Sequence, residues 1–382
     1  MGKGPLIFIS AGEPSGDLHA AGLVAAMRER RPDARFLGIG GPRMEAAGVE
    51  LLASYHQLAV VGLLEVISHA GPILRALRGA KRAISRERPA LTILVDFPDF
   101  NFRLGDHSHS LGIPVFYYIC PQLWAWRQGR VKRLARFAKA LGVILPFEEE
   151  FYRSRGLEAH FVGHPLLDTL RPSTPPHLFR GELGLESGQR LVALLPGSRR
   201  GELQRHLPLM VEAASLMAGR DPSLRFVTAL LHQEHAGLYR RLVPGGGGVE
   251  VPAVVGRTWD CLAAADLALA ASGTVTLEAA ILSTPMVVTY RVSRLTYLLG
   301  RRLIRVPFAS LVNLLARREV VPELLQDRAT PSAMASRALA LLQSPEALAR
   351  MEGELEEVRR MLGGPGASRR AAELALRCGG LL

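Results

Sequence analysis

Residues 91–101, Leu-Thr-Ile-Leu-Val-Asp-Phe-Pro-Asp-Phe-Asn, decide how the first half of this chain folds. The mostly apolar residues 91–95 are typical of a buried strand, and the polar residues after them mark where that strand ends. Asp96, Asp99 and Asn101 therefore lie at the carboxyl end of the strand. In an open α/β sheet, this edge is where ligands bind.

The same alternation of short apolar runs and amphipathic segments extends on both sides of residues 91–101. Amphipathic segments at 18–30 and 71–88 have a helical pattern. Strands that alternate with helices predict βαβ units and a parallel sheet. The other strands predicted in this half are 6–10, 35–39, 115–119, 141–145 and 160–162.

A cluster of prolines, Pro172, Pro175 and Pro176, interrupts the pattern and predicts a linker between domains. The alternation then restarts, and after Pro331 the chain has a mostly helical pattern. The strands predicted in this second half are 191–195, 224–229, 249–251, 267–270 and 286–289.

Two tandem sheets of this kind predict an α/β protein of the GT-B class, in which two Rossmann-like parallel-sheet domains face a cleft. The predicted parts are an acceptor-side domain at 1–171, a donor domain at 172–340, and C-terminal helices at 341–382 that pack back toward the first domain. Transferases, some epimerases and phosphorylases share this layout, so the fold does not decide the function.

The composition excludes several classes of protein. The chain has 382 residues with a net charge of +12, and its lysines are confined to Lys3, Lys81, Lys132 and Lys139. The arginine excess fits either genome composition or an affinity for phosphates and anionic membranes. The sequence contains no zinc spacing, RNP-like signature or basic zipper, so we expect no nucleic-acid partner.

The three cysteines, Cys120, Cys261 and Cys378, lie far apart and form no CxxC pair. This spacing argues against a disulfide framework or a structural zinc site, and it suits a reducing cytoplasm. No stretch approaches the ~18 apolar residues of a membrane span. We therefore expect a soluble or peripherally bound protein.

Asp96 is the candidate catalytic residue. A sugar hydroxyl needs a base when it attacks an anomeric carbon, and a carboxylate held in a desolvated cleft can accept that proton. The alternative is that Asp96 or Asp99 caps a helix or orders the turn around Pro98. The spacing alone leaves both interpretations open.

The loop at 11–17, Ala-Gly-Glu-Pro-Ser-Gly-Asp, follows the first predicted strand. Gly12 and Gly16 allow a tight turn, and either Ser15 or Asp17 can cap the next helix. Because Glu13 and Asp17 would repel a pyrophosphate, we expect the loop to contact the acceptor, with a capped strand-to-helix turn as the alternative.

Residues 121–127, Pro-Gln-Leu-Trp-Ala-Trp-Arg, precede a helical pattern with a strongly basic face. A solvated charged face is the ordinary explanation for such a run. The two tryptophans favour a lipid or phosphate contact, because an aromatic side chain combines apolar area with a polar edge. The predicted acceptor-binding residues are Glu13, Ser15, Gly16, Asp17, Asp99, Asn101, Gln122 and Trp124.

Two turns in the second half favour phosphate. Residues 195–202 combine a glycine, a hydroxyl and two arginines after a strand, which suits a pyrophosphate. Residues 270–278 place small residues before a helix, whose first N–H groups attract anions. Glu278, one turn into that helix, can accept hydrogen bonds from ribose hydroxyls. Helix capping is the alternative for both turns.

Nine motifs occur in one order between residue 11 and about residue 326, and together they resemble the motif series of the lipid-A-disaccharide synthase family. They are AGEPSGDLHAAGL, GIGGPRMEAAG, DFPDFN, PQLWAWRQGRVKR, LPFEEEFY, FVGHPLLD, LPGSRRGE, ASGTVTLEAA and SLVNLLARREVVPELLQ.

The resemblance implies an inverting glycosyltransferase that needs neither a metal nor a cofactor. Its donor would be UDP-2,3-diacylglucosamine and its acceptor 2,3-diacylglucosamine 1-phosphate (lipid X), giving a β-1,6-linked disaccharide 1-phosphate and UDP. By the same resemblance Asp96 is the base, Arg199 contacts the donor phosphate, and Asn313 and Glu278 bind the donor. The predicted donor-binding residues are Gly197, Ser198, Arg199, Ser272, Gly273, Thr274, Glu278 and Asn313.

Two alternatives remain open at this stage. One is another GT-B enzyme that acts on UDP-N-acetylglucosamine, either a transferase or a 2-epimerase. The other is a non-catalytic protein that binds a nucleotide sugar or a lipid. The oligomeric state is also open, with a homodimer as one arrangement.

Acylated substrates require an apolar entrance, and basic residues beside an apolar face are typical of an interfacial helix. We therefore expect a cytoplasmic protein bound peripherally to the anionic surface of the inner membrane. Residues 60–67 and 73–82 are the first candidate for this contact, and residues 294–305 are the second. For either candidate, a core-facing helix with a charged outer face is the alternative. The predicted contact residues are Leu63, Leu64, Ile67, Ile73, Leu74, Leu77, Arg75 and Arg78.

Overall fold

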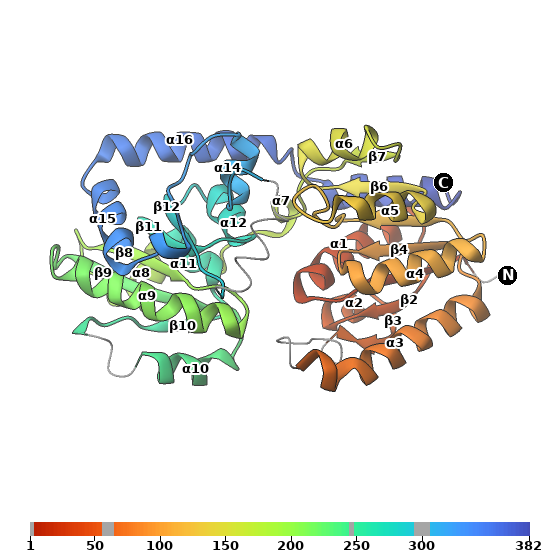
Figure 1. Ribbon diagram of the computed structural model, residues 1–382, viewed down its shortest axis with the longest axis horizontal. Helices are drawn as coiled ribbons and strands as arrows, with labels where there is room; N and C mark the ends of the chain where they lie inside the picture. Colours follow the sequence, from red (N-terminus) through yellow and green to blue (C-terminus); the bar gives the residue numbers. More distant parts are fainter. Residues whose placement is uncertain (1–3, 56–64, 244–247, 294–305) are drawn as a thin grey trace. The chain divides into compact units, whose positions relative to one another are not determined.

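Two parallel β-sheets, each covered by helices, make up the computed structural model of this chain (Figure 1). The structure describes residues 4–55, 65–243, 248–293 and 306–382, and the side chains of residues 65–70 are outside that description. The chain divides into an N-terminal unit, Met1–Asp168 with Leu362–Leu382, and a C-terminal unit, Thr169–Met361. The predicted α/β class with two parallel-sheet domains is confirmed.

The sheet of the N-terminal unit has the strand order β3-β2-β1-β4-β5-β6-β7, and every pairing is parallel. Its strands are β1 (Leu6–Ala11), β2 (Arg35–Gly40), β3 (Val49–Ser54), β4 (Leu91–Val95), β5 (Val115–Tyr118), β6 (Ala140–Val143) and β7 (Ala159–Phe161). Residues 49–54 were not predicted as a strand, because their burial alternates at the edge of the sheet and gives no continuous apolar run.

Helices cover both faces of this sheet. On one face, α1 packs against α17, and a core that includes Leu23, Met27 and Leu376 lies beneath them. On the other face, α3, α4 and α5 cover a second core. The helices of this unit are α1 (Pro14–Arg30), α2 (Pro42–Ala46), α3 (Glu65–Glu87), α4 (Pro98–Ser110), α5 (Val131–Phe137), α6 (Pro146–Arg153), α7 (Leu166–Thr169) and α17 (Ala367–Cys378).

The sheet of the C-terminal unit has the order β10-β9-β8-β11-β12-β13 and is also parallel throughout. Its strands are β8 (Arg190–Leu195), β9 (Leu224–Leu230), β10 (Ala253–Val255), β11 (Leu267–Ala271), β12 (Met286–Tyr290) and β13 (Glu323–Leu325). The prediction of a strand at 249–251 is wrong, since β10 begins at Ala253, and β13 was not predicted. Both are three-residue edge strands, which are too short for a clear apolar pattern.

Helices α9 and α15 pack together over the main core of the C-terminal unit, which includes Met210 and Met334. The helices of this unit are α8 (Pro176–Glu182), α9 (Arg200–Ala218), α10 (His235–Leu242), α11 (Thr258–Ala264), α12 (Val275–Ile281), α14 (Leu311–Ala316), α15 (Pro331–Leu342) and α16 (Pro345–Met361). Within the described residues, no helix combines the length and hydrophobicity that a membrane span needs.

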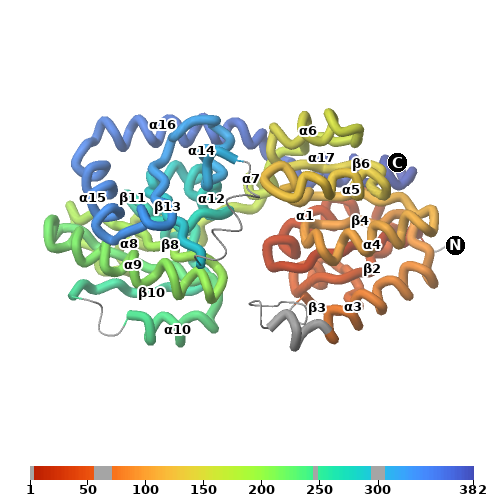
Figure 2. The backbone as a smooth tube through the Cα atoms, viewed as in Figure 1, coloured from red at the N-terminus to blue at the C-terminus, as the bar shows by residue number. Residues whose placement is uncertain are grey.

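The backbone trace shows where the chain passes between the units (Figure 2). The first passage follows Asp168, three residues before the predicted boundary, and the second follows Met361. The predicted C-terminal segment, 341–382, is therefore divided, with α16 in the C-terminal unit and α17 in the N-terminal unit.

The proline cluster is not a loose linker. The carboxylate of Asp260 accepts hydrogen bonds from the backbone N–H of Ser173 at 2.6 Å and of Thr174 at 3.1 Å. The hydroxyl of Ser173 also donates to Asp260 at 2.6 Å, and Arg257 donates to the hydroxyl of Thr174 at 2.7 Å. These bonds fix residues 173–174 to the N-terminus of α11, so this segment is part of the C-terminal unit.

Candidate functional site

The turn between β4 and α4 has a backbone conformation that L-residues rarely adopt. Asp96 and Phe97 have φ values of 46° and 49°, in the left-handed region. The carbonyl oxygen of Asp96 accepts two hydrogen bonds, from the amide nitrogen of Asn101 at 2.8 Å and from the hydroxyl of Tyr117 at 2.7 Å. Consecutive left-handed residues cost on the order of 1–2 kcal/mol each, so these contacts hold the turn in a form that it would not keep alone.

Asn101, a predicted acceptor-binding residue, is fully buried. Its Oδ1 accepts a hydrogen bond from the hydroxyl of Ser10 at 2.7 Å, and its Nδ2 also donates to the carbonyl of Val95 at 3.1 Å. With both amide atoms engaged inside the protein, Asn101 orders the turn that carries Asp96.

The loop after β1 packs directly against this turn. A β-carbon on Gly12 would lie 2.2 Å from the ring of Phe97, so only glycine fits there. Because β1 and β4 are paired, with Ala11 opposite Val95, the loops that follow them emerge side by side. Glu13 and Ser15 are exposed in the first of these loops, and Gly16 is buried. The structure therefore brings Glu13 and Ser15 to the same sheet edge as Asp96.

Asp17, a predicted acceptor-binding residue and candidate helix cap, bonds to another helix of the N-terminal unit. It is 1% exposed, and its carboxylate accepts hydrogen bonds from the backbone N–H groups of Gly41 at 2.8 Å, Arg43 at 3.1 Å and Met44 at 3.1 Å. Those groups form the N-terminus of α2. Asp17 thus stabilises α2 instead of its own helix, which begins at Pro14 with Glu13 in the capping position.

Asp99 and Trp124 also make contacts within the protein. The carboxylate of Asp99 lies 2.8 Å from the guanidinium of Arg130 and 3.8 Å from that of Arg127. Trp124 is 7% exposed, and its indole N–H donates to Glu148 at 2.9 Å. Of the two acceptor-binding residues predicted in this segment, Trp124 is thus buried and Gln122 is exposed.

Glu148 is a buried carboxylate that was not selected from the sequence. Its second oxygen accepts hydrogen bonds from the backbone N–H groups of Ile144 at 3.2 Å and Leu145 at 3.0 Å. Burial raises the pKa of Glu148 to about 7, and the negative charge of Asp96 adds to the rise, while its hydrogen bonds lower it. The sequence did contain a signal for this capping role, because Glu148 is the third residue of a helix that starts with Pro146.

In the C-terminal unit, the loop between β8 and α9 presents Arg199. Gly197 has a φ of 109°, a conformation that favours glycine. The N–H groups of Ser198 and Arg199 donate to the carboxylate of Glu202 at 3.0 and 3.2 Å. These contacts form a capping box at the start of α9, the alternative that the sequence left open for this turn. The guanidinium of Arg199 is 68% exposed and 4.0 Å from Glu202.

The loop between β11 and α12 lies next to the Arg199 loop, because β11 and β8 are paired with Ala270 opposite Leu195. Gly273 and Thr274 are exposed, and Ser272 donates its hydroxyl hydrogen to the carbonyl of Ala309 at 2.7 Å. Burial raises the pKa of Glu278 to about 7, against a hydrogen bond with Trp259 that lowers it. The predicted donor residues of these two loops thus share one sheet edge.

Asn313, a predicted donor-binding residue, is fully buried. Its Nδ2 donates to the carbonyl of Val321 at 2.9 Å and to Glu323 at 2.8 Å. Its Oδ1 accepts from the N–H groups of Val320 and Val321 at 2.8 and 3.0 Å. Every hydrogen-bonding position of the amide is occupied, so Asn313 braces the loop before β13.

His206 links the loop that follows β8 to the residue that follows β12, and the sequence analysis did not predict a role for it. Its Nδ1 lies 3.0 Å from the carbonyl of Pro196, and its Nε2 accepts a hydrogen bond from the N–H of Arg291 at 3.0 Å. Both contacts together require a neutral ring, and burial lowers its pKa accordingly. A histidine inside a helix gives no sequence signal for such a role.

Among the predicted membrane-contact residues that the structure describes, some side chains are exposed and others are buried. Leu63, Leu64 and the side chain of Ile67 lie outside the described residues, as does the segment 294–305. On α3, Leu74 is 39% exposed, Arg75 and Arg78 are exposed, and Ile73 is partly buried against the core. Leu77 is 6% exposed and packs in the core, so the alternative of a core-facing residue holds there, and we exclude it from the surface set.

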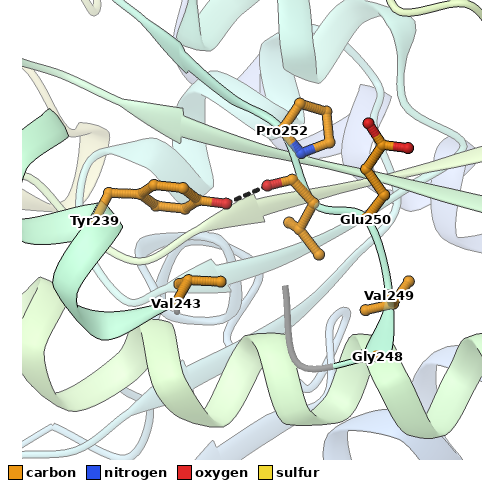
Figure 3. A pocket seen from close by; sticks show the side chains of 7 residues that line it. Tyr239, Val243, Gly248, Val249, Glu250 and Pro252 are labelled. Carbon is orange, nitrogen blue, oxygen red and sulfur yellow. Dashed lines mark hydrogen bonds between the residues drawn. The ribbon is translucent and has the colours of Figure 1, made fainter. Parts of the chain in front are cut away.

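A pocket of about 460 Å³ lies in the C-terminal unit between Tyr239, Val243 and residues 248–252 (Figure 3). Its wall residues 248–252 precede β10, so the pocket lies at the amino edge of the sheet. The loops of Arg199 and Glu278 lie at the opposite, carboxyl edge. The pocket is therefore separate from the candidate donor site.

Comparisons with known proteins give consistent results. A family described as lipid-A-disaccharide synthetase matches residues 7–377. The chain is 44% identical to a lipid-A-disaccharide synthase of Syntrophus aciditrophicus over 97% of each protein. It is also 44% identical to one of Myxococcus xanthus over 98% of each.

Solved structures with low sequence identity share the fold. A UDP-GlcNAc 2-epimerase from Neisseria meningitidis bound to UDP-GlcNAc superposes with a TM-score of 0.65 at 11% identity, covering 97% of this chain and 98% of that one. A UGT transferase from Siraitia grosvenorii in complex with UDP gives 0.61 at 13% identity, covering 98% and 99%. These similarities show the fold alone.

Proposed function

Because this chain belongs to the lipid-A-disaccharide synthase family and is therefore a glycosyltransferase, we propose that it joins two acylated glucosamines. The donor is UDP-2,3-diacylglucosamine and the acceptor is 2,3-diacylglucosamine 1-phosphate. The products are the β-1,6-linked disaccharide 1-phosphate and UDP. The observation that carries this proposal is the family match along residues 7–377.

Asp96 serves as the general base. Its carboxylate accepts the proton of the acceptor's 6-hydroxyl while that oxygen attacks the anomeric carbon from the face opposite UDP, which inverts the configuration. The turn held by Asn101 and Tyr117 supports this role, because a base must be fixed in orientation before the substrate arrives. Glu13 and Ser15, exposed at the same sheet edge, contact the acceptor.

The donor binds at the carboxyl edge of the second sheet. Arg199 neutralises the diphosphate, and Gly273 and Thr274 approach it at the start of α12. Glu278 accepts hydrogen bonds from the ribose hydroxyls. The neighbouring loops of β8 and β11 support this placement, since together they present an exposed arginine beside a helix N-terminus.

The chain associates with the inner surface of the cytoplasmic membrane through α3. Leu74 is exposed there beside Arg75 and Arg78, and a side chain that enters the lipid boundary next to arginines is the pattern of an interfacial helix. Such a placement gives the enzyme access to substrates whose acyl chains stay in the bilayer.

A mass-spectrometric assay with defined substrates tests the proposed reaction. We expect the disaccharide phosphate and UDP to form in equal amounts only when the acylated donor and the acylated glucosamine phosphate are both present. Incubation with UDP-N-acetylglucosamine alone exposes a 2-epimerase through its epimerised product. UDP binding without turnover of any of these substrates would instead indicate a binding protein and overturn the proposal.

A further inference from the structure

Arg127 is one of several exposed basic residues on or beside α4 and α5, and the carboxylate nearest to it is already paired with another arginine. Arg133 on α5 donates from Nε and Nη2 to Asp106 on α4, at 2.9 and 2.6 Å. Arg130 pairs with Asp99 at 2.8 Å. Arg127 is left with a 3.8 Å approach to the same Asp99 carboxylate, and its side chain is 48% exposed.

Two features hold this guanidinium in place. Arg127 has φ 53° and ψ 37°, a left-handed conformation that is uncommon for a residue with a β-carbon. Its guanidinium carbon lies 4.4 Å from the centre of the Trp126 ring, and that ring is itself 40% exposed. A cation stacked on an aromatic face loses less freedom when it binds an anion, because its orientation is already restricted.

Arg127 and Asp96 lie in segments that leave the same edge of the N-terminal sheet. The segment that carries it follows β5, which pairs with β4. Its ion-pair partner Asp99 comes three residues after Asp96, on the first turn of α4, where the helix dipole adds positive potential. A ligand bound at Asp96 can therefore reach Arg127 within the N-terminal unit.

We infer that Arg127, supported by Trp126 and by the neighbouring Arg130, binds the phosphate monoester of the acceptor. This inference rests on the proposed function and names the group that the acceptor site recognises. A phosphate monoester carries a charge of about −1.5 to −2 at pH 7, and a guanidinium can bind two of its oxygens at once. The 6-hydroxyl and the 1-phosphate lie at opposite ends of one sugar, so Asp96 and Arg127 fix both ends.

The inference is tested by steady-state kinetics of the full chain with 2,3-diacylglucosamine 1-phosphate as the varied substrate. Arg127→Gln keeps a polar side chain that can donate hydrogen bonds and removes the positive charge. We expect KM for the acceptor to rise by roughly ten- to hundredfold, the loss of a charge-assisted hydrogen bond, with kcat changed by less than about threefold. Arg127→Lys should have a KM between those of wild type and Arg127→Gln, because lysine keeps the positive charge but cannot bind two phosphate oxygens as a guanidinium does.

Arg136→Gln is the matched control, because Arg136 is an exposed arginine on α5, which begins four residues after Arg127. Equal increases in KM for the two variants would mean general electrostatic attraction and would overturn the inference. With an acceptor whose 1-phosphate is replaced by a methyl ether, wild type and Arg127→Gln should have the same KM. A difference that persists with this analogue would also overturn it.

Vesicles of phosphatidylcholine and phosphatidylglycerol separate the acceptor phosphate from a membrane phosphate. Arg127→Gln and Arg136→Gln should bind these vesicles equally. If Arg127→Gln weakens vesicle binding alone and leaves the acceptor KM unchanged in detergent, Arg127 contacts the membrane and the inference is wrong. An inactive wild-type enzyme would instead refute the proposed function.

Discussion

The guanidinium of Arg199 is exposed at the end of the β8–α9 loop, whereas the N–H groups of Ser198 and Arg199 are bonded to Glu202. A diphosphate that approaches this loop meets the arginine first. Donor affinity should therefore depend on the Arg199 side chain more than on the backbone.

We expect Arg199→Ala to weaken UDP binding by roughly ten- to hundredfold, which corresponds to about 1.5–3 kcal/mol for a charge-assisted hydrogen bond. Isothermal titration calorimetry measures this directly. Arg200→Ala is the control, since it removes an exposed arginine from the adjacent position. Equal affinity of wild type and Arg199→Ala for UDP would remove Arg199 from the donor site.

At the scale of residues, the sequence located the loops better than it located the contacts within them. Asn101, Asn313 and Trp124 were all predicted to touch a substrate, and all three are buried and bonded inside the protein. A polar residue in a ligand-binding loop and one that shapes the loop have the same local pattern. Only burial and hydrogen-bond partners, which depend on the three-dimensional fold, distinguish them.

Helix α3 presents two leucines three residues apart to different surroundings. Leu74 is 39% exposed and Leu77 is 6% exposed within the core. The spacing of apolar residues on α3 predicted a single apolar face for both. The difference arises because only the neighbouring elements decide which part of that face is covered.

We expect Leu74→Ser to reduce binding to anionic vesicles while the protein stays folded, because it removes apolar area from the membrane contact. Leu178→Ser is the control, since Leu178 is 54% exposed in the other unit and should leave binding unchanged. High salt should weaken wild-type binding without abolishing it, because apolar burial is not screened. Sedimentation with vesicles measures each case, and unchanged binding of Leu74→Ser would exclude this surface.

At the scale of elements, long buried strands were predicted well and edge strands poorly. Residues 91–95 form β4 as predicted, because a central parallel strand is buried on both faces and is apolar throughout. The edge strands β3 and β13 lack that pattern and were missed. The candidate loops could be found because they follow the central strands β1, β4, β8 and β11.

In the whole molecule, the C-terminal helix α17 completes the N-terminal unit. Asp168 accepts hydrogen bonds from the N–H groups of Gly366 and Ser368 at 2.5 and 2.9 Å, which fixes the start of the helix. Its alanines, among them Ala371 and Ala375, share a core with α1. The stability of the N-terminal unit therefore depends on α17.

The stability of this unit should also depend on pH through His19. This residue is 7% exposed, and its Nδ1 has no hydrogen-bond partner in the part of the chain that the structure describes. Burial lowers the pKa of His19 from 6.5 to about 4, and the charge of Arg43 lowers it further, against Asp168, which raises it. Between pH 6.5 and about 4 the unfolded chain thus binds the proton more tightly.

We therefore expect the free energy of unfolding to fall as the pH drops through that window, by up to about 1.4 kcal/mol per pH unit for this group. His19→Leu should lose less stability than wild type between pH 7 and 4.5. Thermal unfolding midpoints across that range measure the difference, with the exposed His109→Leu as a control. Parallel pH profiles for wild type and His19→Leu would contradict the assignment.

The turnover of Asp96→Asn tests the central claim most directly. Asparagine keeps the shape of the side chain and removes its basicity, so turnover should fall by ~10²–10⁴ while UDP binding is retained. Asp99→Asn should have the smaller defect, because Asp99 pairs with Arg130 at 2.8 Å. If Asp96→Asn stayed active and Asp99→Asn were inactive, Asp96 would not be the base.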